Sequence, residues 1–169
     1  MRVVGYARES AGAEDALPVF AQQEEIRRWA AAHGHHLVAV CQDSRQAGYA
    51  LRRDGYLALL GTIASGGVDA VVVAGLECLA SDQIVQEILL WDLRSRGVPV
   101  VSTIAEEAPL TGDGDPGPTR MLIRDVLARV AEHAGTLDAH PPARPPGTAD
   151  VVVQLLRPAE EPGPATARG

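Results

Sequence analysis

The sequence predicts an α/β domain built on a mostly parallel sheet of four or five strands flanked by helices. Its 169 residues, 46% of them apolar, are enough to bury one hydrophobic core. Short apolar runs alternate with longer segments in which apolar residues recur at helical spacing, which is typical of parallel sheets connected by helices. The expected strands are residues 3–7, 37–41, 68–74 and 98–104.

Two helices are expected between the first three strands. The first covers Val19–Ala32, with Ile26 and Trp29 on its core side. It ends before Gly34, because glycine readily adopts the left-handed conformation that closes a helix. The second covers Asp54–Ala64 and also ends at glycines. Each helix would connect two parallel strands across one face of the sheet.

A third helix is expected after Ser81 and Asp82, since the side chain of either residue suits the position that caps a helix amino terminus. Ile84, Ile88 and Trp91 follow at positions i, i+4 and i+7 and therefore share one face of this helix. We predict that this apolar stripe packs into the core.

The chain then changes character. Residues 106–118 are rich in glycine, proline and aspartate and predict a flexible loop. A fourth helix is expected over Pro118–Ala139, where Leu122, Val126 and Val130 recur every four residues within a broad apolar surface. We expect this helix to protrude and to pack on both its own domain and a partner chain.

The chain is expected to divide at residue 139. Residues 1–139 form the α/β domain, and residues 140–169 form a proline-rich linker and a largely disordered tail. Within the tail, residues 150–156 have the composition of a short edge strand.

Charge and composition narrow the range of partners. The net charge is −7, whereas phosphate-binding surfaces are normally basic, so we expect DNA binding by this chain alone to be weak.

No apolar run is long enough to span a membrane, and the first residues lead directly into a strand. The cytoplasm is therefore the expected location, without a membrane partner. Cys41 and Cys78 lack clustered cysteine or histidine partners, so neither a disulfide framework nor a zinc site is expected.

Two other groups of residues are candidate metal ligands. His33, His35 and His36 surround a glycine at the end of the first helix, where a solvated helix terminus is the commoner explanation. Asp113 and Asp115 alternate with glycines as in a calcium loop, but the glutamate and the spacing of that motif are missing. We therefore predict no metal and no cofactor.

The candidate chemistry lies at the end of the first strand, in the segment Tyr6-Ala7-Arg8-Glu9-Ser10. Arg8 and Ser10 are two residues apart, so in a strand their side chains share one face. A guanidinium can orient a phosphate and stabilise its transition state while a hydroxyl attacks it, so the pair fits phosphoryl transfer. An isolated Arg-x-Ser is more often ordinary strand-end surface, and the rest of the chain must decide.

Motifs over roughly residues 1–139 resemble the catalytic domain of the serine recombinases, the resolvase and invertase family. The opening Gly5-Tyr6-Ala7-Arg8-Glu9-Ser10 resembles the family signature of tyrosine, arginine and nucleophilic serine. Further matches are Gln22, residues 43–48, Arg53 and residues 71–82. The resemblance implies a resolvase-like fold in which Ser10 attacks a DNA phosphate that Arg8, Arg53 and Gln22 bind.

Five positions depart from the family pattern. They are Glu77, in place of an aspartate, and Cys78, Ser81, His133 and Ala139, each in place of an arginine. Because the reaction uses arginines to stabilise a phosphorane-like transition state without a metal, these substitutions predict a degenerate active site. Family members usually add a basic DNA-binding region, which residues 140–169 are not expected to form.

Three functions remain open. The first is an oligomeric interaction or regulatory module with impaired catalysis, which pairs with itself or with a partner recombinase through residues 118–139. The second is an active recombinase or DNA-nicking enzyme that uses Ser10 with Arg8 and Arg53 and forms a phosphoserine link to DNA. The third is a phosphate-binding protein or phosphoesterase on the same scaffold. The altered cationic positions favour the first.

Overall fold

The computed structural model describes residues 1–10, 17–46, 53–112 and 114–139, with the backbone alone at residues 10, 44–46 and 136–139. The expected edge strand at 150–156 lies outside the described residues, as does Asp113. In chain order the elements are β1 (Arg2–Ser10), α1 (Val19–Ala32), β2 (His36–Gln46), α2 (Asp54–Ala64), β3 (Ala70–Val73), the 3₁₀ turn η1 (Leu76–Cys78), α3 (Gln83–Ser95), β4 (Val100–Ser102), the 3₁₀ turn η2 (Ala105–Glu107), α4 (Ala108–Thr111) and α5 (Pro118–Ala139).

The strands of the described residues form one parallel sheet in the order β2-β1-β3-β4. This arrangement confirms the predicted α/β class. Because all the strands run in the same direction, their carboxyl ends meet at one edge of the sheet, the usual place for a binding site in such folds. At that edge Arg8 of β1 lies in register with Asp43 of β2.

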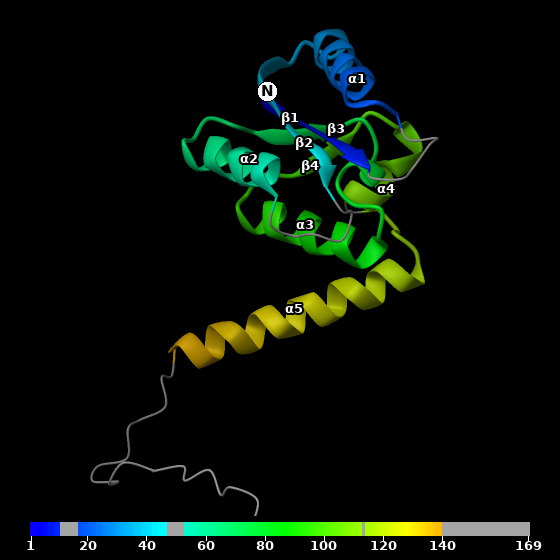
Figure 1. The fold of residues 1–169 in the computed structure, drawn as a ribbon. Helices are drawn as coiled ribbons and strands as arrows, with labels where there is room; N and C mark the ends of the chain where they lie inside the picture. Colours follow the sequence, from blue (N-terminus) through cyan, green and yellow to red (C-terminus); the bar gives the residue numbers. More distant parts are fainter. Residues whose placement is uncertain (11–16, 47–52, 113, 140–169) are drawn as a thin grey trace, which may run out of the picture.

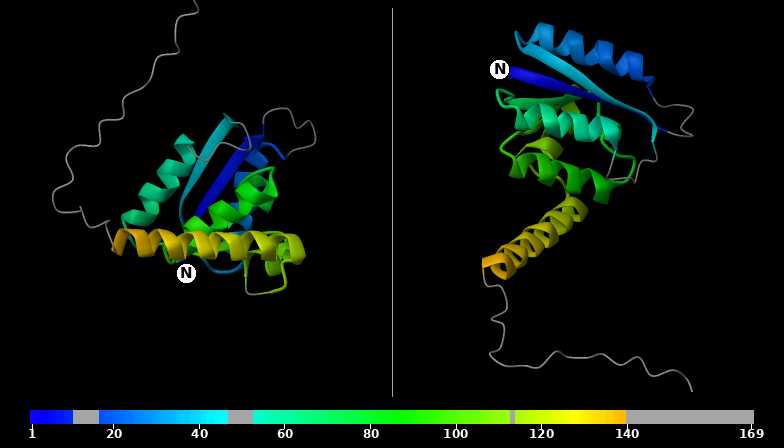
Figure 2. Two further views of the ribbon diagram at one scale, coloured as in Figure 1. Left: turned by 90° about the horizontal axis from the view of Figure 1, so that it is seen from below. Right: turned by 60° about the vertical axis from the view of Figure 1, so that its left-hand side comes forward.

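Helices cover both faces of the sheet (Figure 1). α1 packs on one face, where Ile26 and Ala30 share an apolar cluster with Val3 and Val72. α2 and α3 cover the other face, and further views show the same layers (Figure 2). The core on the α2 and α3 side includes Val4, Tyr6, Leu59, Val71, Leu90 and Leu93.

Local sequence signals set the helix ends. α1 and α2 have the predicted bounds. α1 is followed by Gly34 at φ +64°, and α3 by Gly97 at φ +77°, a backbone conformation that side chains with a Cβ rarely adopt. Asp82 caps α3, because its carboxylate accepts a 3.0 Å hydrogen bond from the backbone N–H of Val85.

The predicted core face of α3 is wrong. Ile84 is 55% exposed, and Ile88 and Trp91 are half-buried. α3 carries apolar residues at helical spacing on two faces, and the sheet is covered by the leucine face instead, made by Leu89, Leu90 and Leu93.

The flexible loop predicted over residues 106–118 is also partly wrong. Residues 105–111 form the helical turns η2 and α4. Glu107 holds this segment in place, because its carboxylate accepts hydrogen bonds from the N–H of Leu76 at 2.8 Å and from the hydroxyl of Ser102 at 2.6 Å. These tertiary hydrogen bonds are invisible to local composition.

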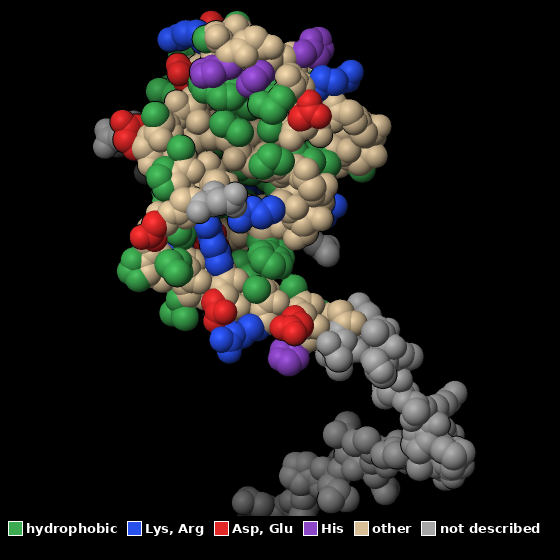
Figure 3. Space-filling view, turned by 180° about the vertical axis from the view of Figure 1, so that it is seen from behind, with side chains coloured by type: hydrophobic (Ala, Val, Ile, Leu, Met, Phe, Trp, Pro, Cys, Tyr) green, Lys and Arg blue, Asp and Glu red, His purple; other side chains and the backbone are tan. Residues whose placement is uncertain are grey.

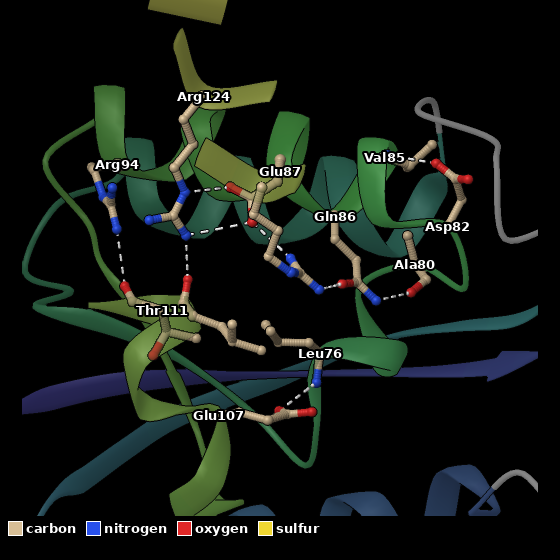
Figure 4. A network of polar contacts seen from close by, with 12 residues as sticks. Leu76, Ala80, Asp82, Val85, Gln86, Glu87, Arg94, Glu107, Thr111 and Arg124 are labelled. Carbon is tan, nitrogen blue, oxygen red and sulfur yellow. Dashed lines mark hydrogen bonds and ion pairs between the residues drawn. The ribbon is translucent and has the colours of Figure 1, made fainter. Parts of the chain in front are cut away.

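α5 crosses α3, and its carboxyl-terminal part extends beyond the body of the domain (Figures 1 and 2). Polar side chains anchor it to α3. Buried Glu87 accepts a 2.6 Å hydrogen bond from Arg120 and a 2.7 Å hydrogen bond from Arg124 (Figure 4). Arg120 also donates to Gln86, and Arg124 donates to the carbonyl of Leu110. No helix in the described part of the chain is both long and apolar enough to cross a membrane.

Candidate active site

The candidate site begins on β1. Tyr6, Arg8 and Ser10 alternate along this strand, and Tyr6 and Arg8 are both almost completely buried. Ser10 is the last residue of β1, at the carboxyl edge of the sheet, and its side chain lies outside the described atoms. A register shift in the pairing with β2 occurs between Arg8 and Ser10, so the strand is irregular where the predicted nucleophile stands.

The hydroxyl of Tyr6 connects Asp43 of β2 to Arg53, the residue before α2. Its hydroxyl donates a 2.6 Å hydrogen bond to the carboxylate of Asp43 and accepts a 3.0 Å hydrogen bond from Nη1 of Arg53. Burial raises the pKa of the Tyr6 phenol, and the hydrogen bond to Asp43 raises it further. The phenol therefore stays neutral and acts as a hydrogen-bonding link between the carboxylate and the guanidinium.

Asp43 also binds the amino terminus of α2. Its carboxylate accepts hydrogen bonds from the N–H groups of Gly55 at 2.7 Å and Tyr56 at 3.1 Å. These N–H groups belong to the first turn of a helix, where they lack intrahelical acceptors and where negative charge is favoured. Position 55 requires glycine, because a Cβ there would lie 2.1 Å from the carbonyl oxygen of Gln42.

Both candidate arginines donate to main-chain carbonyls around η1. Arg8 donates from Nε to the carbonyl of Cys78 at 3.2 Å and from Nη2 to that of Glu77 at 2.8 Å. Arg53 donates from Nη1 to the carbonyl of Leu79 at 2.7 Å. The two guanidinium groups thus bind three successive carbonyl oxygens of one turn.

The two arginines also affect each other electrostatically. Burial lowers the pKa of Arg8, and the positive charge of Arg53 lowers it further. Two cations close together in a buried setting favour a nearby anion or a set of carbonyl dipoles. In the described structure, the carbonyls of residues 77–79 provide such dipoles.

Gln22 fixes β1 to the start of α1. Its side-chain oxygen accepts from the N–H of Arg8 at 2.9 Å, and its amide nitrogen donates to the carbonyls of Arg8 at 2.9 Å and Leu17 at 2.6 Å. The glutamine therefore orients the backbone at Arg8. Its predicted contact with phosphate stays a prediction.

A family model matches most of the chain. The model of the family described as Resolvase, N terminal domain, matches residues 3–138. The chain belongs to the resolvase family. No match was found among the curated proteins.

Three solved structures share the fold of this resolvase-family domain. The N-terminal catalytic domain of TP901-1 integrase is 20% identical, with a TM-score of 0.57 over 82% of this chain and 99% of that chain. The C-terminal catalytic domain of ISC1926 TnpA, an IS607-like serine recombinase, is 24% identical, with a TM-score of 0.53 over 81% and 86%. A resolvase family site-specific recombinase from Streptococcus pneumoniae is 21% identical, with a TM-score of 0.52 over 82% and 91%.

The departures from the resolvase pattern fall in different surroundings. Glu77 is exposed within η1, Ser81 is exposed after it, and His133 is exposed on α5. The side chain of Ala139 is outside the described atoms. Cys78 is buried, and burial raises the pKa of its thiol to about 12, so the thiol is protonated near neutral pH.

Arg124 and Arg129 of α5 each form an ion pair with a carboxylate. Arg124 lies against α3, where it donates to Glu87 at 2.7 Å. Arg129 forms an exposed pair with Asp125 on its own helix at 3.1 Å. The pair of Arg129 with Asp125 follows from their i,i+4 spacing, whereas the acceptor of Arg124 lies 37 residues away and could not be read from the sequence.

Sequence reasoning missed the joint role of Tyr6 and Asp43 in this resolvase-family site. The signal for Tyr6 was present, because it shares the strand face of Arg8. The signal for Asp43 was weaker, because its place beside Tyr6 depends on the register between β1 and β2. Tyr6 and Asp43 together hold Arg53, which is the residue before α2, next to Arg8 of β1.

Proposed function

We propose that this chain is a resolvase-type interaction module in which phosphoryl transfer is impaired and association through α5 is retained. The observation that carries the proposal is the engagement of Arg8 and Arg53 with the carbonyls of residues 77–79. Guanidinium donors used to hold a turn are less available to a phosphate. The same turn carries Cys78, where the family resemblance leads us to expect an arginine.

The expected effect on the reaction is large. Removing one preorganised donor to the charge that develops in a transition state lowers the rate by about 10²- to 10³-fold. The rate losses caused by residues of one cluster are not additive, so the total loss is smaller than the product of the losses at each altered position. One such loss already makes strand cleavage by Ser10 too slow to compete with that of an intact site.

The surface of α5 supports the association. Leu122, Val126 and Val130 are 66%, 51% and 60% exposed, and their four-residue spacing places them along one side of the helix. α5 is anchored to α3 through Glu87 and arginine side chains, which leaves this apolar stripe for another chain. We propose a second copy of this chain, or a partner recombinase, as the occupant.

The charge of the protein leads us to expect that this chain alone binds DNA only weakly. On the face shown in Figure 3, arginine and acidic side chains are interspersed over the described residues, and histidines gather near α1. With a net charge of −7, few counterions would be released when the protein meets DNA. Targeting to DNA would therefore come from the partner.

The test is a supercoiled-plasmid nicking assay at low salt, with the unsubstituted 169-residue protein and the Ser10→Ala variant side by side. We expect both proteins to leave the plasmid intact and to form no covalent adduct. Nicking and a serine-linked adduct with the unsubstituted protein, both lost in Ser10→Ala, would show an active recombinase. A monomer in sedimentation velocity would argue against association.

An active nicking enzyme is the second candidate, favoured by the joint retention of Arg8, Ser10 and Arg53 in the predicted order on the sheet edge. The plasmid assay separates the two functions directly. A phosphate-binding protein without turnover is the third, and it would show saturable binding of inorganic phosphate that the Arg53→Gln substitution weakens.

A further inference from the structure

The described part of the domain has an apolar groove between α2 and α3. Its cavity volume is about 440 Å³, and it is lined by Tyr56, Leu57 and Leu60 of α2 and by Ile88, Leu89, Trp91, Asp92 and Ser95 of α3. Most of this lining is hydrophobic, with Asp92 and Ser95 as the polar exceptions. The groove lies on the face of α3 that the sequence analysis assigned to the core.

The groove leaves large side chains in contact with water. Leu57 is 53% exposed, and Ile84, on the same face of α3 as Ile88 and Trp91, is 55% exposed. Covering a leucine or isoleucine side chain fully is worth about 1.5–3 kcal/mol, so an occupant of this surface would gain stability. α5 does not line the groove, since its contact with α3 runs through Glu87.

We propose that residues 151–156 of the same chain, Val-Val-Val-Gln-Leu-Leu, dock in this groove. Five of the six residues are apolar, in a segment otherwise surrounded by proline, glycine and charged residues. Six residues in an extended conformation span about 20 Å, at 3.3 Å per residue. This length matches α3, whose 13 residues extend about 20 Å at 1.5 Å per residue.

The tail can reach the groove. α5 ends at Ala139, about 22 Å beyond Arg124 along the helix axis, on the side of the molecule where α2 lies (Figures 1 and 2). Residues 140–149 include four prolines, and in a polyproline conformation these ten residues span about 31 Å. The linker is therefore long enough for the segment to return to α3 of its own chain.

The first experiment reads the environment of Trp91 in the groove. In the 169-residue protein carrying Trp29→Phe, Trp91 is the one remaining tryptophan of this sequence. Adding Val152→Asp and Leu155→Asp should shift its emission to the red and increase quenching by acrylamide, because the segment no longer covers the ring. A matched control with Thr148→Asp and Thr166→Asp adds the same charge outside the apolar segment and should leave the spectrum unchanged.

Either of two outcomes overturns the proposal. If the Val152 and Leu155 substitutions leave emission and quenching unchanged, the segment does not occupy the groove. If their effect disappears when the protein is diluted, the occupant is the tail of a second copy. The expected result is an effect that is independent of protein concentration.

Hydrogen exchange supplies a second test that does not depend on Trp91. Residues 151–156 should show slowed amide exchange in the full-length protein and lose that protection in Leu57→Arg, which places a charge in the groove at an exposed position. Exchange of these amides at the rate of an unstructured chain would overturn the proposal. The proposal is independent of catalysis, so an active enzyme in the plasmid assay would leave it intact.

Discussion

Glu87 of α3 and Arg120 of α5 form a buried ion pair with a distance of 2.6 Å between Oε1 and Nη1, and Arg124 binds the other carboxylate oxygen at 2.7 Å. We predict that Glu87→Ala destabilises the domain by about 3–5 kcal/mol, because it leaves buried guanidinium charge without its acceptor. Urea unfolding measures this loss. The control is Arg129→Ala, whose exposed pair with Asp125 should contribute about 0–1 kcal/mol. Equal losses in the two variants would contradict a buried anchor.

Two glycines of α2 should respond in opposite directions to alanine. Gly55→Ala forces a Cβ against the carbonyl of Gln42 and should cost about 3 kcal/mol or more. Gly61→Ala meets no atom within 4 Å and should stabilise the helix by about 0.5–1 kcal/mol. Thermal unfolding of the two variants checks the prediction, which fails if Gly55→Ala is tolerated.

Tyr6→Phe removes the hydroxyl that joins Asp43 to Arg53. We expect a loss of about 1–3 kcal/mol, because a buried carboxylate and a buried guanidinium each lose a hydrogen bond. Tyr56→Phe removes one hydrogen bond, to half-buried Asp92, and should cost less. Denaturant unfolding of both variants makes the comparison, and a larger loss for Tyr56→Phe would contradict the central place of Tyr6.

Cys78 should make the domain less stable in alkali. Burial raises the pKa of its thiol from 9.0 to about 12, so the folded state holds the proton more tightly than the unfolded chain. This contribution is complete below pH 9 and is lost as the pH rises toward 12. Cys78→Ala should therefore reduce the slope of unfolding free energy against pH above 9. An unchanged slope would show that the thiol is accessible to water.

Val126→Glu should abolish association through α5, because it places a charge in the middle of the exposed apolar stripe. Sedimentation velocity measures the change. Ala128→Glu is the matched control, since it also adds one negative charge at an exposed position of α5, on the side of the helix opposite the stripe. If the control dissociates as readily as Val126→Glu, then association depends on charge and not on the stripe.

The parts of the fold that follow from local sequence could be predicted. Gly34 and Asp82 mark helix ends through their own backbone preference and side-chain chemistry, and the structure confirms both. Arg8 and Arg53 could be proposed as anion ligands from the motif. Their binding to carbonyls of residues 77–79 could not, because it depends on how η1 folds back over β1.

The face of α3 that covers the sheet could not be chosen from spacing alone. The series Ile84, Ile88 and Trp91 is as regular as the leucine series that forms the core. Periodicity identifies an apolar face and says nothing of what covers it. The choice depends on side-chain fit against β-strands far away in the chain.

The central position of β1 has a consequence for the order in which the protein can fold. β1 precedes the other described elements in the chain, yet it pairs with β2 on one side and with β3 on the other. The backbone N–H of Arg2 bonds to Asp69, 67 residues later. Contacts of such long sequence separation form slowly, because the intervening chain must first be ordered. On the ribosome, β1 must therefore wait with an unpaired edge until about half of the α/β domain has emerged.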